Sequence, residues 1–185
     1  IPAEIRNTYL QHPSGDPRVE ELAKRVTKMA PNRYAKAHAL QQYLRSHYGY
    51  SLVLRGTPNS KDPIAMFLFE TRQGHCEYFA SAMTLMLRQL GIPARLVNGF
   101  RAGEYNSLGN NWIVRQYDAH SWVEAYFPPY GWLEFDPTPA EYRGDRNAFS
   151  RLISNIGDAV DLWWWEGIVN YDSTKQYGVI STLYS

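Results

Sequence analysis

The sequence has only one cysteine, Cys76, among its 185 residues. A single thiol excludes an internal disulfide and any zinc site that needs several cysteines. The formal net charge is only +1 and the basic residues are dispersed among acidic ones, so the sequence lacks the charge pattern of a nucleic-acid-binding protein. Its acidic residues are scattered, without the regular spacing of a calcium loop. We therefore predict no metal and no cofactor.

Long apolar stretches are also missing, and the sequence contains neither a predicted transmembrane segment nor a secretion signal. The chain begins at Ile1 rather than at methionine, so we expect it to be a piece of a longer protein. With 44% hydrophobic and 15% aromatic residues it can bury a core. We predict a single domain over residues 1–185, without an internal repeat or a linker.

The pattern of apolar residues changes along the chain. Apolar positions recur every three to four residues over 17–30 and 33–48, which predicts two helices, and a short strand is predicted over 50–54 and a short helix over 64–69. Further strands are predicted over 94–101, 112–117, 119–127 and 132–135, with 103–111 as a loop and 128–131 as a turn. A helical tail is predicted from about residue 146, and its Trp163-Trp164-Trp165 cluster would pack on the core or lie near a membrane interface. Helices followed by consecutive strands indicate an α+β domain with an antiparallel sheet.

Cys76 lies at the start of the most apolar helical segment. Residues 79–87 carry no charge, which predicts a central helix buried on all sides. Arg88, Gly91 and Pro93 supply the basic last turn, the left-handed cap and the stop. A thiol at a helix start is close to the positive end of the helix dipole and to unpaired N–H groups, which favour the thiolate. This position leaves two interpretations open, a nucleophile or a small buried residue.

Two residues later in the chain fit a nucleophilic cysteine. His120 lies on the polar, aromatic face of its predicted strand, while the alternate residues form the core face. Asp136 ends the next strand, where its carboxylate would fix one imidazole tautomer and stabilise an imidazolium. For this contact the register must differ by one residue from a pairing of Phe127 with Trp132. Asp118 is the rival carboxylate, although it is two residues from His120 along one strand and would more often be solvated.

Aromatic residues near these positions are candidates for a substrate cleft. Trp122 and Trp132 would wall an acyl site, although packing is the commoner role of such residues. His75 is adjacent to Cys76, but neighbours at a helix start point apart, so we interpret His75 as a cleft or surface residue.

Four blocks, in this order, resemble the transglutaminase-like superfamily: RQGHCEYFA at 72–80, GIPAR at 91–95, DAHSWVE at 118–124 and GWLEFDPT at 131–138. They define a motif core of about residues 62–138, between an N-terminal helical flank at 1–61 and a C-terminal extension at 139–185. The likeness is greatest to extracytoplasmic domains of bacterial membrane-embedded transglutaminases of the TgpA type. It implies a papain-like fold and a domain on the periplasmic face of the inner membrane. It also implies Cys76 as nucleophile, His120 as base and Asp136 as the residue that orients His120.

The resemblance implies a protein-glutamine gamma-glutamyltransferase, which forms a thioester from a glutamine of a protein or peptide and passes it to a primary amine. Run with water, the same three residues would make a deamidase, an amidase or a cysteine protease. A non-catalytic module that binds peptide or cell-wall material is a third hypothesis. The backbone N–H of Cys76 is the expected oxyanion donor, because a helix start presents it. A second donor has no clear counterpart among Tyr48, Tyr50 and Gln73, and Gln73 is kept among the cleft candidates.

Overall fold

The structure is a computed structural model that describes residues 1–53, 62–107 and 109–140. These residues belong to two compact units, one made of 1–101 with 119–140 and the other made of the segment between them. The predicted helical tail and its tryptophan cluster lie outside the described residues. The prediction of one domain over residues 1–185 therefore stays a prediction.

The first unit begins with three helices, α1 (Ala3–Tyr9), α2 (Pro17–Val26) and α3 (Arg33–His47). The predicted helices at 17–30 and 33–48 are confirmed as α2 and α3, although α2 ends earlier than predicted. Beyond it the Thr27 hydroxyl donates to the Ala23 carbonyl at 2.8 Å, which is typical of a residue that competes with helix continuation. α1 was not predicted.

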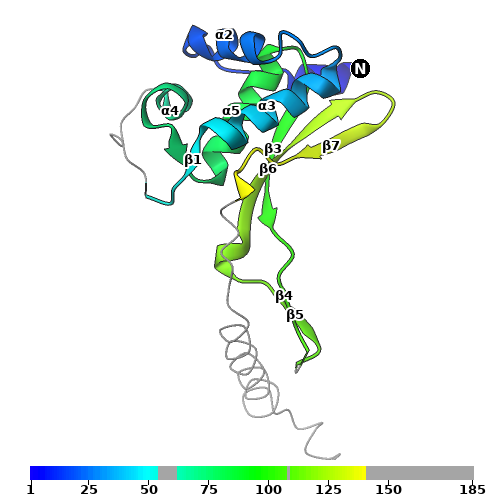
Figure 1. Cartoon of the computed structure of the whole chain (residues 1–185). Helices are drawn as coiled ribbons and strands as arrows, with labels where there is room; N and C mark the ends of the chain where they lie inside the picture. Colours follow the sequence, from blue (N-terminus) through cyan, green and yellow to red (C-terminus); the bar gives the residue numbers. More distant parts are fainter. Residues whose placement is uncertain (54–61, 108, 141–185) are drawn as a thin grey trace, which may run out of the picture. The chain divides into compact units, whose positions relative to one another are not determined.

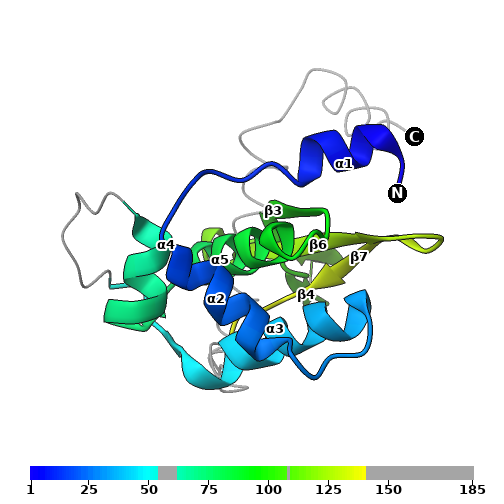
Figure 2. The same ribbon diagram turned by 90° about the horizontal axis from the view of Figure 1, so that it is seen from above.

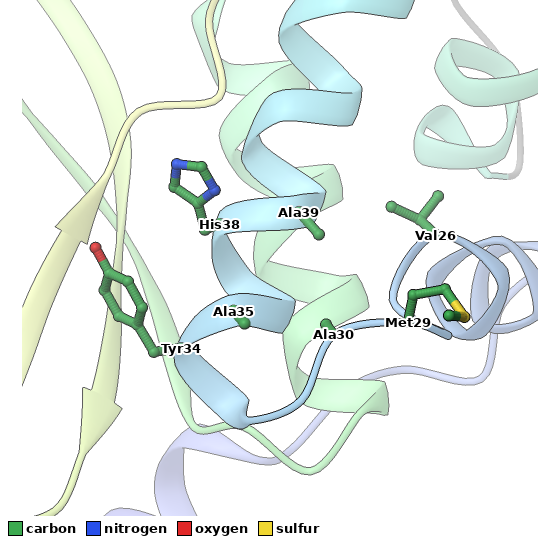
Figure 3. A pocket seen from close by; sticks show the side chains of 7 residues that line it. All are labelled: Val26, Met29, Ala30, Tyr34, Ala35, His38 and Ala39. Atoms are coloured by element: carbon green, nitrogen blue, oxygen red, sulfur yellow. The ribbon is translucent and has the colours of Figure 1, made fainter.

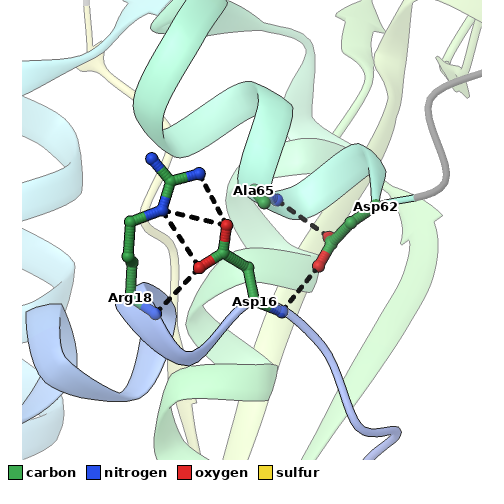
Figure 4. A network of polar contacts seen from close by, with 4 residues as sticks. All are labelled: Asp16, Arg18, Asp62 and Ala65. Carbon is green, nitrogen blue, oxygen red and sulfur yellow. Dashed lines mark hydrogen bonds and ion pairs between the residues drawn. The ribbon is translucent and has the colours of Figure 1, made fainter.

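Asp62 links the start of α2 to the start of α4 (Pro63–Met66). Its Oδ2 accepts the backbone N–H of Asp16 at 3.0 Å, and its Oδ1 accepts the N–H of Ala65 at 2.9 Å (Figure 4). Asp16 in turn caps α2 through the N–H of Arg18. Two capping carboxylates therefore fix where the motif core begins relative to the N-terminal helices.

A tight reversal precedes the cysteine helix. α4 continues into a π-helical turn, η1 (Phe67–Thr71), which is closed by Arg72 in the left-handed region at φ 51°. Strand β2 (Gln73–Gly74) then pairs in parallel with β1 (Gly49–Tyr50). The strand predicted over 50–54 is therefore wrong for 51–53, since only Tyr50 belongs to a strand. Its partner strand β2 leads directly into the next helix.

α5 (Cys76–Gln89) is the predicted central helix, and it packs against α2, α3, β3 and β6 (Figure 1). Seven of its residues are buried, among them Phe79, Met83 and Met86. Gly91 ends it at φ 71°, as predicted, and the N–H of Ile92 donates to the Leu87 carbonyl at 2.9 Å.

The antiparallel sheet has the order β3 (Ala94–Phe100), β6 (Ala119–Phe127) and β7 (Gly131–Phe135), which confirms the predicted α+β class. Phe127 pairs with Gly131, whose φ of 83° suits a residue without a side chain. The register therefore differs by one residue from a pairing of Phe127 with Trp132, as the contact of Asp136 with His120 requires. The next position along β7, Asp136, falls opposite Trp122 and so on the face of His120.

The two faces of this sheet are covered differently. Val123, Ala125 and Phe135 face the helical core, whereas α1 lies across the other face (Figure 2). There the ring of Tyr9 lies 4.8 Å from that of Trp132. Because α1 has only seven residues and buries none of them fully, its periodicity is too short to identify it in the sequence.

The second unit contains a hairpin, β4 (Glu104–Asn106) and β5 (Asn111–Ile113), followed by a 3₁₀ turn, η2 (Gln116–Asp118). The predicted loop over 103–111 is therefore wrong for β4, and the predicted strand over 112–117 covers only the end of β5. The polar and glycine content of 103–111 hid two short strands that are joined by Asn110 at φ 51°.

Candidate active site

Cys76 is the first residue of α5 and is half-buried. His75 precedes it in an extended conformation and makes no side-chain cap. The backbone N–H of Cys76 therefore has no partner within the helix. The thiol is therefore close to the positive end of the helix dipole and to unpaired backbone N–H groups, which both favour the thiolate.

His120 and Asp136 meet where β6 begins and β7 ends. His120 is buried, with 6% of its surface exposed, and its Nε2 lies 2.9 Å from Asp136 Oδ2. Asp136 is held from two further sides, because its Oδ1 accepts the N–H of Thr138 and its own N–H donates to Gln41 Oε1, each at 3.0 Å. The carboxylate is thus fixed before any substrate binds.

The thiol of Cys76 lies near His120 and Ser121, and both residues act to lower its pKa. Because Nε2 of His120 is engaged by Asp136, Nδ1 is the ring nitrogen left for the thiol. Nδ1 is buried and has no hydrogen-bond partner in the part of the chain that the structure describes. The structure therefore shows the His120–Asp136 contact and a buried imidazole nitrogen that is available to the nearby thiol.

The pKa values of these groups favour a charged pair. Burial raises the pKa of the Cys76 thiol, but polar interactions with His120 and Ser121 outweigh it and bring this pKa below its usual 9.0. Burial lowers the pKa of His120, but its bonds to Asp136 and Cys76 bring it above 6.5. Burial also raises the pKa of Asp136, yet bonds from His120 and Thr138 hold it below 3.8. These shifts favour a thiolate beside an imidazolium.

Arg101, which was not predicted as a site residue, lies directly after β3. Its Nη2 is 3.1 Å from His120 Nε2 and 3.5 Å from Asp136 Oδ2. Strand alternation contains a signal for this position, because Arg101 is two residues from Gly99, the partner of His120 in the register.

Ser121 was missed as well. Its hydroxyl donates a hydrogen bond to Asn98 Oδ1 at 2.7 Å, and the two residues lie opposite each other in the β3–β6 register.

The rival carboxylate, Asp118, belongs to the second unit and accepts a hydrogen bond from the N–H of Arg115 at 2.7 Å. The carboxylate that contacts His120 is that of Asp136.

The two tryptophan candidates lie at different places. The ring of Trp122 is 6.3 Å from that of His120 and nearly parallel to it, so Trp122 flanks the site. Trp132 is the second residue of β7 and lies four residues before Asp136, which follows the other end of the strand. Its ring packs against Tyr9 and Tyr126, and Cζ of Arg95 lies 4.4 Å from the centre of the ring. The structure does not bring Trp132 together with Cys76.

His75 and Gln73 are close to Cys76 in sequence but lie apart from the reacting groups. His75 lines a pocket of about 460 Å³ with Tyr78 and Ser81, which share a helix face turned well away from Cys76. Gln73 is exposed in β2, and its side chain lies beside Gly49. Tyr48, which was also considered as a second oxyanion donor, is buried, and its hydroxyl donates a hydrogen bond to the Leu68 carbonyl at 3.2 Å.

A second pocket, of about 490 Å³, lies between the end of α2 and the first turns of α3. Its lining includes Val26, Met29, Tyr34 and His38 (Figure 3). It contains neither the thiol nor the imidazole and carboxylate that contact each other.

Among the described residues, no cluster of three or more metal-binding side chains occurs. None of the described helices has both the length and the apolar character that a membrane span needs.

The profile of the transglutaminase-like superfamily matches residues 20–137, which is more than half of the chain. The chain belongs to the transglutaminase-like superfamily. It is 43% identical over 137 residues to the Bacillus subtilis protein YebA, covering 70% of this chain and 19% of that protein. It is 41% identical over 124 residues to a protein-glutamine gamma-glutamyltransferase of Pseudomonas aeruginosa, covering 67% and 18%. The chain thus spans about a fifth of the length of these relatives.

Solved structures support the assignment to this superfamily and its papain-like fold. The periplasmic domain of TgpA from Pseudomonas aeruginosa matches with a TM-score of 0.71 and 39% identity, covering 79% of this chain and 53% of that one. A Cytophaga hutchinsonii protein, provisionally assigned as a cysteine protease, matches with a TM-score of 0.55 and 25% identity, covering 75% and 43%. The superfamily fold therefore occurs with more than one assigned chemistry.

Proposed function

We propose that this domain is a thiol acyltransferase of the protein-glutamine gamma-glutamyltransferase type, with Cys76, His120 and Asp136 as its catalytic triad. The observation that supports it best is the 2.9 Å contact of His120 Nε2 with Asp136, which leaves the buried Nδ1 of His120 for the thiol of the only cysteine at the start of α5. The name of the Pseudomonas aeruginosa relative supplies the reaction class.

The first half-reaction forms a thioester. The Cys76 thiolate attacks the carbonyl carbon of a glutamine carboxamide. The negatively charged oxygen of the resulting tetrahedral intermediate accepts a hydrogen bond from the backbone N–H of Cys76. When the C–N bond breaks, the imidazolium of His120 gives its proton to the departing nitrogen, which leaves as ammonia. Asp136 keeps the imidazole oriented throughout.

The second half-reaction transfers the acyl group. A primary amine attacks the thioester, and His120 takes a proton from the amine as the new C–N bond forms. The C–S bond breaks and the Cys76 thiolate returns. The products are an isopeptide bond and the free thiol group, with no cofactor consumed.

Water in place of the amine would give a deamidase or a cysteine protease, and the provisional assignment of the Cytophaga hutchinsonii protein makes this the second candidate. The acyl donor is a protein or peptide, with cell-wall peptides among the acceptors or donors to test. By likeness to the periplasmic domain of TgpA, we place the domain on the periplasmic face of a membrane-embedded parent protein.

The test incubates the protein with a glutamine-donor peptide and a labelled primary amine, and measures both incorporation and ammonia. Cys76→Ala should abolish both, whereas Ser81→Ala, on the opposite side of the same helix, should retain both. Equal incorporation by wild type and Cys76→Ala would disprove the triad. Ammonia without incorporation favours the hydrolytic candidate, and peptide binding without either product favours a non-catalytic module.

A further inference from the structure

A guanidinium lies against the His120–Asp136 pair. Arg101 Nη2 is 3.1 Å from His120 Nε2 and 3.5 Å from Asp136 Oδ2, while Nε2 and Oδ2 are 2.9 Å apart. The three atoms form a closed triangle. Only about a third of the Arg101 and Asp136 side chains is exposed, and 5% of that of His120, so solvent screens these contacts only in part.

The triangle holds two nitrogen donors and one carboxylate oxygen. When His120 Nε2 carries a proton, it and Arg101 both donate toward Asp136 Oδ2. Once His120 gains its second proton, two cations lie side by side and repel each other. The cation of Arg101 therefore opposes the charged form of His120.

The other arrangement of protons has the same consequence. If Arg101 donates to Nε2, that nitrogen must be unprotonated, and the proton of the neutral ring is on Nδ1. Nδ1 is the nitrogen that is left for Cys76, and a protonated Nδ1 cannot accept the proton of the thiol. In this arrangement the thiol stays neutral.

We propose that Arg101 is a positioning residue that restrains the triad, opposing the imidazolium that Asp136 and Cys76 favour and so limiting the thiolate–imidazolium pair. The charged or titratable groups that contact His120 in the described part are Cys76 from α5, Arg101 from the end of β3 and Asp136 from the end of β7. Asp136 and Cys76 favour the imidazolium, and Arg101 is the one that opposes it. The inference takes the triad from the proposed function, but its test needs no substrate.

The test follows His120 by ring ¹⁵N NMR as the pH is varied, in the folded wild-type domain and in four variants. Arg101→Gln and Arg101→Met remove the charge, Arg101→Lys keeps it, and Arg33→Gln removes an exposed arginine of α3 with the same change of net charge. His120→Gln assigns the signal among the five histidines.

Both neutral variants should move the titration midpoint of His120 to higher pH, and Arg101→Lys and Arg33→Gln should leave it near the wild-type value. Alkylation of Cys76 by iodoacetamide at neutral pH should become faster in the neutral variants. The proposal is overturned if neither neutral variant moves the midpoint, or if Arg101→Lys moves it as far as Arg101→Gln. Since no glutamine donor or amine is present, this result does not depend on whether acyl transfer occurs.

Discussion

Asp136 Oδ2 lies 2.9 Å from His120 Nε2 because the turn before β7 pairs Phe127 with Gly131. A pairing of Phe127 with Trp132 would turn the carboxylate toward the helical core, since side chains alternate between the faces of a sheet. The turn thus determines whether the imidazole has an acidic partner.

Asp136→Asn keeps the size of the side chain and removes its charge, so the imidazole loses the group that fixes its tautomer. We expect amine incorporation to fall by a factor on the order of 10³ to 10⁴. Glu134→Gln is the matched control, because it removes an exposed carboxylate from the same strand. Activity of Asp136→Asn close to that of the wild type would contradict the assigned role.

The stability of the domain should depend on the same pair in a defined pH range. Asp136 has a lowered pKa, so its contribution is present above its usual 3.8 and is lost as the pH falls through the folded-state pKa. His120 has a raised pKa, so its contribution is complete below 6.5 and is lost as the pH rises through the folded-state pKa. Both contributions are therefore present between these two values.

In a Cys76→Ala background, which removes the titrating thiol, Asp136→Asn should lower the free energy of unfolding most between pH 3.8 and 6.5. A charged hydrogen bond of this kind is worth about 1.5 to 3 kcal/mol. Urea unfolding across the pH range measures the difference. A difference that is constant with pH would show that the pair does not titrate as inferred.

The sequence identified the parts of this site that follow from local patterns. The uncharged stretch after Cys76 indicates a buried helix, and the alternation around His120 separates a core face from a polar face. The burial of Val123, Ala125 and Phe127 bears this out. The requirement that the register differ by one residue also followed from alternation alone.

What the sequence could not give depends on contacts between distant segments. Alternation indicates that Arg101 shares a strand face with Gly99, but no local pattern specifies the β3–β6 register that pairs Gly99 with His120. α1 is too short for periodicity, and its Tyr9 contacts Trp132, more than a hundred residues away. For the same reason Trp132 could not be told from Trp122, since both are aromatic strand residues with the same local pattern.

Cys76 should be more reactive than an ordinary thiol at neutral pH, because its pKa is lowered. His120→Gln should slow its alkylation by iodoacetamide, since the hydrogen bond from His120 is the largest cause that lowers this pKa. His75→Gln, next to Cys76 but turned into a different pocket, should have little effect. The urea-unfolded protein, with the same single cysteine, gives the rate of an unperturbed thiol. A folded wild type no faster than this reference would contradict the activation of Cys76.

Gly99 has no room for a side chain. A Cβ there would lie 2.8 Å from Cη2 of Trp122, so Gly99→Ala should displace the indole that flanks His120. We expect a loss of about 1 to 3 kcal/mol in the free energy of unfolding, as for other overpacked sites, together with lower activity. In a Trp122→Phe background, which lacks the clashing atom, the cost of Gly99→Ala should shrink. An unchanged cost would place the strain elsewhere.

Trp132 should affect stability and not the chemistry of the thiol. It lies at the far end of β7 from Asp136, where it contacts Tyr9 and Arg95. Trp132→Leu removes two aromatic contacts and one cation–π contact, so we expect a loss of about 1.5 to 4 kcal/mol by urea unfolding. The alkylation rate of Cys76 in the folded protein should stay at the wild-type value. Trp122→Leu, which changes the surroundings of His120, should alter that rate, and the reverse order of effects would assign the cleft to Trp132.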